Sequence, residues 1–429
     1  MGFAKATGTY VLNDADTWAE AYDIISQYGL SQVSLSALDF NRSARAIGSA
    51  HPVFLHGAAA IASPLSVRAH FRRGFAWNTG DQRVQYWWPQ GVSGTGDAYE
   101  GGLLDGRQLV LTSWHYSVPE EEEVNDLSPP SLDLEPIAVA TGFQATLGKE
   151  ATDKGVRVSV VNLSGDDLGY RHLLLVEPGW GSYDTGTEAD GTVNIAMKPD
   201  FRTVPIHAGG IALVGPFLYV ADTYEGFRVF DTRYVLEIES AAGSHGEVGW
   251  SASLGKYHAC GYRYILPQVS AYKWSSSDLF RFSTLGLDRS GATPSLVCAE
   301  YWNSSLGAEH GFDPADARAI WWEIASDSTL ASTADGVASA VDQRVTGLDY
   351  VQGVVSRDGV GYFARSGPYQ QLAGRPVDGG AGANFYWAHG PEGLYTDAAN
   401  GLLWHTTEHT DERVVFACHF TTLLPFIGS

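Results

Sequence analysis

The chain has 429 residues, a formal net charge of −22, and 44% hydrophobic and 18% charged residues. This acidic balance argues against nucleic acid or an anionic membrane surface as a partner, because both require a basic footprint. No run of about twenty apolar residues is present, so no membrane-spanning helix is expected. The 49 glycines and 12% aromatic residues favour one large β-rich body.

The first 75 residues differ from the rest and are predicted to form an N-terminal extension. Residues 14–28 place apolar side chains at helical spacing, with Asn13 or Asp14 as N-cap and Gly29 as the stop. Residues 31–35 alternate like a strand, which is expected to close the fold against the last part of the chain. Residues 76–429 are assigned to the main domain.

A short phrase recurs in that domain, with a polar residue just before a glycine that opens an apolar strand. Its copies are Pro89-Gln90-Gly91-Val92, His207-Ala208-Gly209-Gly210-Ile211, Gln352-Gly353-Val354-Val355 and Pro391-Glu392-Gly393-Leu394, with a weaker relative at Pro267-Gln268-Val269. Each strong copy leads to a turn and a second apolar strand. Such repetition is typical of a radial β-architecture, in which glycine suits the crowded axis.

The spacing of these phrases predicts an all-β fold, a single β-propeller with a short helix in its extension. The intervals suit blades of about 40 to 60 residues with unmarked blades between them. Six or seven blades fit the length best, and seven is preferred. The alternative is that the glycines belong to hairpins in a β-sandwich or in two smaller β domains.

The polar residue of each phrase is expected near the axis, where loops from several blades converge. Three other segments are rich in titratable and aromatic groups: Trp114-His115-Tyr116, Tyr170-Arg171-His172, and residues 257–264. Each has a structural alternative, since His172 could simply cap a buried strand. No nucleophile elbow, phosphate loop or zinc helix is present, which leaves His, Tyr and Arg as the reactive set.

Three longer stretches resemble a known family: Tyr86-Trp87-Trp88-Pro89-Gln90-Gly91-Val92, residues 170–178, and residues 207–231. They are similar to secreted actinobacterial and fungal propeller proteins, among them the fungal lyases that cleave the rhamnose–glucuronate cap of gum arabic. The resemblance runs from about Trp77 onward, and residues 391–408 also resemble blades of streptogramin lyase. It implies a secreted, seven-bladed polysaccharide lyase.

β-Elimination from a uronic acid needs a base, a cation for the carboxylate and an acid for the leaving oxygen. The residue types suggest His115 or His207 as base, Tyr224 or Tyr257 as acid, and Arg171 or Arg263 for the carboxylate. Further substrate-binding candidates are Gln90, His172, His258, Gln268 and Trp114. His389 and Glu392, with Glu408 nearby, are candidate ligands for a divalent cation such as calcium, although no spacing requires one.

Two other classes stay open: a non-catalytic carbohydrate-binding propeller, and a glycoside hydrolase using carboxylates such as Asp97, Glu225 and Glu392. The polar residue varies among the copies, which favours one central site over a repeated lectin site. Scarce methionine and three glycosylation sequons favour secretion, although the start shows no signal peptide. The expected partner is an acidic polysaccharide or oligosaccharide, and the protein is expected to be a monomer. The three cysteines allow at most one intrachain disulfide.

Overall fold

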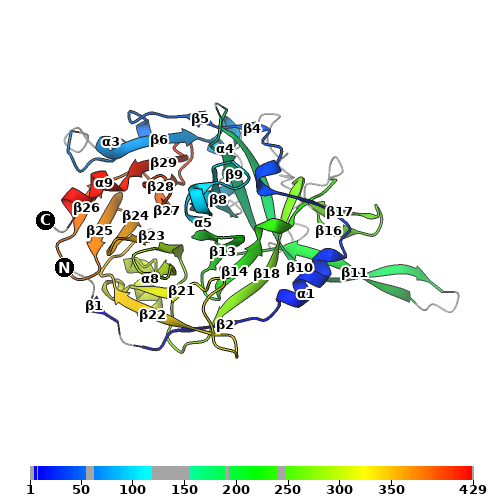
Figure 1. Cartoon of the computed structure of the whole chain (residues 1–429). Helices are drawn as coiled ribbons and strands as arrows, with labels where there is room; N and C mark the ends of the chain where they lie inside the picture. The colour runs from blue at the N-terminus through cyan, green and yellow to red at the C-terminus, as the bar shows by residue number, and fades with distance from the viewer. Residues whose placement is uncertain are drawn as a thin grey trace.

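The computed structural model describes residues 4–6, 8–54, 62–117, 154–165, 167–188, 193–239 and 247–427. Their strands build a β-propeller, with antiparallel blades arranged around one axis (Figure 1). The inner strands of successive blades contact one another, and the last contacts the first. The ring is therefore closed, and the prediction of an all-β propeller is confirmed.

Within the described residues there are five blades, each with four strands from the axis outward. Blade 1 contains β7 (Trp87–Gly94), β8 (Leu109–Tyr116), β9 (Val156–Asn162) and β10 (Gly169–Thr187). Blade 2 contains β12 (Ile211–Val214), β13 (Phe217–Asp222), β14 (Gly226–Asp231) and β18 (Tyr264–Trp274). Blade 3 contains β19 (Thr284–Asp288), β20 (Ser295–Ala299), β21 (Arg318–Glu323) and β22 (Val337–Val345).

The last two blades complete the circle. Blade 4 contains β23 (Val351–Arg357), β24 (Val360–Arg365), β25 (Gln371–Pro376) and β26 (Ala383–Tyr386). Blade 5 contains β27 (Pro391–Asp397), β28 (Leu402–Thr407), β29 (Val414–His419) and β6 (Phe71–Ala76), with β5 (Arg45–Ala46) beside β6. Blade 5 thus joins strands from the two ends of the sequence.

The expectation of six or seven blades is wrong, because long insertions enlarge the blades. Gly91 and Gly210 stand 119 positions apart yet open consecutive inner strands. The weak copy at Gln268 lies on β18, an outer strand, whereas the true mark of blade 3 is Gly286. Inserted segments include hairpin β10–β11 (β11 is Val193–Thr203) and hairpin β16–β17 (Val248–Ser251 and Lys256–Ala259).

Glycine in the inner strands is required by close backbone approach around the axis. A Cβ on Gly91 would lie 2.7 Å from the backbone nitrogen of Ile211 in blade 2. A Cβ on Gly393 would lie 2.7 Å from the nitrogen of Val92 in blade 1 and 2.8 Å from the carbonyl oxygen of Gln90. These backbone atoms could make room for a Cβ only if a whole blade shifted.

We therefore expect Gly393→Ala to destabilise the fold by about 1–3 kcal/mol, the cost of overpacking a close-packed site. Gly48→Ala is the matched control, because a Cβ there meets no atom within 4 Å and the backbone is not left-handed. Urea unfolding followed by tryptophan fluorescence measures both variants. Equal stability of the two variants would contradict the crowded-axis explanation of the repeated glycine.

The N-terminal extension wraps around the propeller (Figure 1). The predicted helix is present as α1 (Trp18–Ser26), capped at Thr17 rather than at Asn13 or Asp14, which belong to β2 (Val11–Asp14). Strand β2 pairs with β18 and β22, and β1 (Ala4–Lys5) pairs with β22. Strand β3 (Ser31–Val33) pairs with β15 (Val235–Glu237), so the expected closure of the last blade by residues 31–35 is wrong. Strand β6 makes that closure instead.

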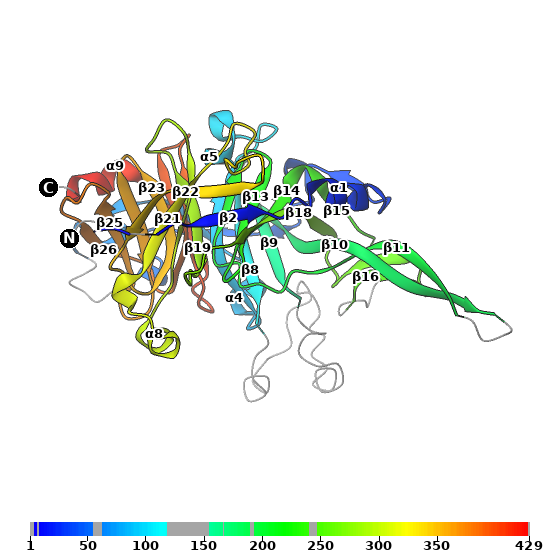
Figure 2. The ribbon, with the colours of Figure 1, turned by 90° about the horizontal axis from the view of Figure 1, so that it is seen from below.

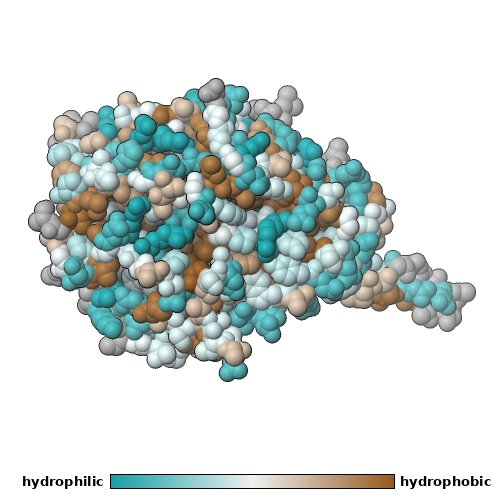
Figure 3. All heavy atoms as spheres, in the orientation of Figure 1, coloured by the Kyte–Doolittle hydropathy of each residue, from teal (hydrophilic) through white to brown (hydrophobic). Residues whose placement is uncertain are grey.

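Short helices follow the strands at the two faces of the disc. α5 (Thr95–Ala98) lies on one face, and α4 (Thr79–Arg83) and α8 (Ser304–His310) lie on the other (Figure 2). The described residues include no helix that is long and apolar enough to cross a bilayer. Cys260, Cys298 and Cys418 are all buried and free. Figure 3 shows hairpin β10–β11 projecting from the disc, where Ile195 and Met197 are exposed.

Candidate functional site

Polar side chains gather at the axis on the face of the disc that carries α4 and α8. Inner strands all begin at this face, and each second strand, running antiparallel, ends there. We call the group the axial cluster; its members are Gln90, His115, His207, Tyr224, Arg281, Gln352, Glu392 and Glu408. Contacts and the influence of nearby charges divide these residues into two parts, a carboxylate pair and an imidazole pair with an arginine.

The carboxylate pair consists of Glu392, at the start of β27, and Glu408, just after β28. Glu392 is completely buried, and Gln352 Nε2 donates to its Oε1 at 3.1 Å. Gln90 Nε2 donates to Glu408 Oε2 at 3.2 Å. Burial and the neighbouring Glu408 raise the pKa of Glu392 well above its usual value, and burial also raises the pKa of Glu408. Each carboxyl group therefore disfavours the negative charge of the other, and Glu392 takes up a proton more readily than an isolated carboxyl group does.

Arg413 holds the backbone of Glu408 in place. This fully buried residue donates from Nε to the Glu408 carbonyl oxygen at 2.8 Å. Its Nη1 donates to the carbonyl oxygens of Asp81 and Val84, at 2.8 and 2.7 Å. The loop after β28 is therefore tied to α4 and to Val84, the residue that caps its C-terminal end.

His115 and His207 stack with ring centroids 4.2 Å apart and planes at 25°. Desolvation by the protein packed around the axis and the positive charge of Arg281 lower the pKa of His207 to about 4, while part of the residue stays exposed to solvent at the end of the axis. Burial, His207 and Arg413 lower the pKa of His115 well below its usual value. Both rings are neutral at neutral pH, and each can therefore accept a proton.

Arg281 precedes β19 and completes the second part of the cluster. Its Nη1 donates to the Tyr224 hydroxyl at 2.6 Å, and the guanidinium packs over the rings of Tyr224 and Trp302 at 5.1 and 5.4 Å. Its Nε is buried and has no hydrogen-bond partner within the described parts of the chain. A positive charge with an unused donor thus lies beside a neutral imidazole, a suitable place for an anionic group.

The cluster contains four residues predicted as site residues from sequence: Gln90, His115, His207 and Tyr224. Glu392 also belongs to it, as a hydrogen-bonded carboxyl rather than as a metal ligand. Gln352 was identified from sequence as the polar residue of one repeated phrase, but not as a site residue. Arg281 was not among the residues predicted from sequence, because the only signal for it is a lone arginine just before an inner strand.

The residues predicted as metal ligands, His389 and Glu392, contact different partners in the structure. His389 Nδ1 contacts Glu412 at 2.5 Å, and its ring packs against that of His409. Gln90 and Gln352 present N–H groups to the carboxylates, whereas a cation would need oxygen lone pairs. In the part of the chain that the structure covers, no three His, Cys, Asp or Glu side chains form a group able to hold a metal ion.

Four further predicted residues lie buried outside the cluster. Tyr257, in hairpin β16–β17, donates its hydroxyl to the Pro199 carbonyl at 2.6 Å. His258, in the same hairpin, lies 3.6 Å from Glu247. Gln268 is on an outer strand, where Arg228 donates to it at 3.4 Å. Trp114 is fully buried within blade 1. These positions are explained by packing.

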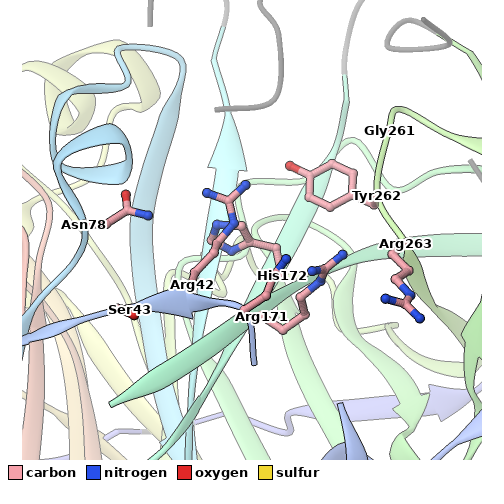
Figure 4. A pocket seen from close by; sticks show the side chains of 9 residues that line it. Arg42, Ser43, Asn78, Arg171, His172, Gly261, Tyr262 and Arg263 are labelled. Carbon is pink, nitrogen blue, oxygen red and sulfur yellow. The ribbon is translucent and has the colours of Figure 1, made fainter. Parts of the chain in front are cut away.

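The last three predicted residues, Arg171, His172 and Arg263, line a separate pocket at the rim of the disc (Figure 4). His172 is almost completely buried, and its Nδ1 accepts from the Ser159 hydroxyl at 2.8 Å. Its Nε2 therefore carries the proton and donates to Asp81 at 3.2 Å. The two arginines come from β10 and from the turn before β18.

Comparisons with known proteins add a distant structural likeness. No family model matches the chain, and no curated protein matches it. Among solved structures, it is similar to the β-propeller domain of Cps50 (Swd1) from Myceliophteria thermophila. The two chains are 10% identical, with a TM-score of 0.29, over 61% of this chain and 89% of the other.

Proposed function

We propose that the protein is a polysaccharide lyase that cleaves a glycosidic bond to a uronic acid by β-elimination at the axial cluster. The observation that carries the proposal is the neutral His115–His207 stack beside the Arg281 guanidinium. This places a proton acceptor next to a cation, which is the arrangement needed to remove a proton beside a carboxylate.

The proposed step uses this chain's own groups. Arg281 binds the uronate carboxylate, and His207 accepts the proton from the adjacent carbon. The C–H electron pair becomes a carbon–carbon double bond, and the bond from the ring carbon to the glycosidic oxygen breaks. Tyr224, which is 53% exposed, gives its proton to the leaving oxygen. Glu408, supported by the buried Glu392, accepts hydrogen bonds from sugar hydroxyls.

A glycosidase mechanism has less support. Two catalytic carboxyl groups normally stand about 5–9.5 Å apart with the sugar between them. Glu392 and Glu408 instead lie so close together that Glu408 helps to raise the pKa of Glu392. Asp97, another carboxylate considered, lies on α5 at the opposite face and forms an ion pair with Arg289. The carbohydrate-binding alternative would predict equivalent sites in several blades, whereas the repeated polar position is glutamine in blades 1 and 4, histidine in blade 2 and glutamate in blade 5.

The resemblance noted in the sequence makes the rhamnose–glucuronate bond at the ends of gum arabic chains the first substrate to test. We extend the proposal to a secreted monomer that acts on acidic polysaccharide. The test follows the ultraviolet absorbance of the double bond conjugated to the carboxylate, with gum arabic and a panel of other uronate polysaccharides.

We expect Arg281→Gln to lower kcat/KM by about 10²–10³-fold, because the variant loses the charge that stabilises the developing enolate. Arg202→Gln is the matched control, since this arginine is exposed and pairs with Glu177 on the projecting hairpin. Tyr224→Phe should lower kcat with little change in KM. Reducing sugar released without absorbance would indicate hydrolysis, and binding without any product would indicate a lectin.

A further inference from the structure

The rim pocket has a volume of about 360 Å³ and is lined by four segments of the chain (Figure 4). They are Asn41 to Ser43 around β4 (Arg42–Ser43), Asn78 before α4, Arg171 and His172 of β10, and Gly261 to Arg263. A cavity of this size can hold one sugar ring or a comparable small ligand. Its wall comes from the N-terminal extension as well as from blade 1 and the segment before β18.

Three guanidinium groups face this one pocket, from Arg42, Arg171 and Arg263. That concentration is unusual in a chain with 27 basic and 49 acidic residues. Burial, together with the positive charges of Arg42 and Arg263, lowers the pKa of Arg171. Positive charges that face the same pocket repel one another, so an anion placed among the three guanidinium groups would stabilise them.

Carboxylates of the chain satisfy these arginines only in part. Asp39, about half exposed at the mouth, lies 3.0 Å from Arg263 but 3.8 Å from Arg171. Asp81, buried beneath, lies 3.5 Å from Arg42 and also pairs with Arg157 at 2.9 Å. Glu237 pairs with Arg263 on the outer side. None of these three carboxylates is among the residues that line the pocket.

Unused hydrogen-bond donors remain in the pocket. Arg42 Nη1 is buried and has no hydrogen-bond partner in the described residues. Arg171 is only 15% exposed, and the described residues accept no hydrogen bond from it. A buried guanidinium without an acceptor is costly, and an incoming oxyanion would supply the missing acceptor atoms.

Aromatic packing holds two of the arginines in place before any ligand arrives. The ring of Tyr264 lies 5.4 Å from the Arg171 guanidinium carbon and 5.5 Å from that of Arg263. Tyr264 itself is 2% exposed. Because the two forks are oriented by a fixed ring, less side-chain entropy is lost when they bind an anion.

We propose that the rim pocket is a binding site for an oxyanion, namely the carboxylate of an acidic sugar or a sulfate or phosphate group. This site is distinct from the axial cluster and does not depend on the function proposed there. Arg171 and Arg42 donate to the ligand, and Arg263 adds charge and exchanges its contact with Asp39 for one with the ligand.

Calorimetric titration at low ionic strength tests the site with glucuronate, inorganic sulfate and inorganic phosphate as separate probes, and with glucose as the neutral control. The protein carries the Arg281→Gln substitution, so that binding at the axial cluster does not contribute. We expect saturable binding of at least one anion and none of glucose. Binding of glucuronate alone identifies a carboxylate site, whereas binding of sulfate or phosphate identifies a tetrahedral oxyanion.

Arg171→Gln and Arg42→Gln are each expected to raise Kd at least tenfold, while Arg202→Gln leaves Kd unchanged. Arg171→Lys keeps the positive charge but loses the planar guanidinium group with its paired donors. Its Kd should therefore fall between the wild-type and Arg171→Gln values. Urea unfolding confirms that each variant is folded. The proposal is overturned if no anion binds saturably, or if binding survives in Arg171→Gln and Arg42→Gln. Neither outcome bears on elimination at the axis, which the absorbance assay measures independently.

Discussion

His207→Ala is expected to lower kcat for elimination by about 10²–10⁴-fold, the usual contribution of a general base. His207 is exposed to solvent, lies near enough to Arg281 for its pKa to be lowered by that charge, and is neutral at neutral pH. His115→Ala should cause a smaller loss, because His115 supports the ring of His207 by stacking. Absorbance of the unsaturated product, measured under saturating substrate, gives kcat for each variant.

The pH dependence separates a base from a structural histidine. Because burial and Arg281 lower the pKa of His207 to about 4, the wild-type rate should hold from neutral pH down to about pH 5 and fall toward pH 4. Arg281→Gln removes part of what lowers the His207 pKa. As the pH is lowered, the residual activity of this variant should therefore begin to fall at a higher pH than that of the wild type. His419→Gln serves as the control, since His419 ends β29 at the opposite face. An acid limb unmoved by Arg281→Gln would contradict the assignment of His207 as base.

Asp81→Asn is expected to destabilise the protein by about 3–5 kcal/mol at neutral pH, the cost of removing one partner from a buried charge network. Asp81 is 1% exposed and accepts from Arg157 at 2.9 Å, from Tyr170 at 2.5 Å and from His172 at 3.2 Å. The variant would leave the Arg157 guanidinium buried without its carboxylate. Urea unfolding at pH 7 measures the loss.

The pH dependence of stability supplies a second readout for Asp81. Burial alone would raise its pKa, but His172, Arg157 and Arg42 hold that pKa well below its usual value. The unfolded chain therefore binds more protons than the folded chain below about pH 4, and the stabilisation present at neutral pH is lost as the pH falls. In Asp81→Asn, stability should depend less on pH in this acidic range. Asp411→Asn, in an exposed pair with Arg83, should change stability by less than about 0.5 kcal/mol.

A decrease as small as that of Asp411→Asn would show that the buried network contributes little to the fold. The network matters for both sites, because Asp81 belongs to α4. Arg413 links the backbone of α4 to Glu408 in the axial cluster, and the Asp81 side chain supports Arg42 and His172 in the rim pocket. Stability and site geometry are thus coupled through one carboxylate.

The repeated phrase was sufficient to predict the propeller and one end of its axis. Glycine is required where inner strands meet, as at Gly91 and Gly393, and this local demand is visible in sequence. The residue before each glycine must then lie at the start of an inner strand, so Gln90, Gln352 and Glu392 were correctly placed near one another. His207, three positions before Gly210, follows the same logic.

The number of blades and the membership of the sites required the tertiary structure. Long insertions hide the blade period, because a loop or hairpin adds residues without adding an inner strand. Arg281 and Tyr224 come from different blades, and they contact each other near His207 because of the way neighbouring blades pack around the axis. Arg171, His172 and Arg263 are of the right type for the axis, yet strand order puts them at the rim. Residue chemistry is local and was determined by the sequence alone, whereas the distances between blades depend on packing across the whole ring.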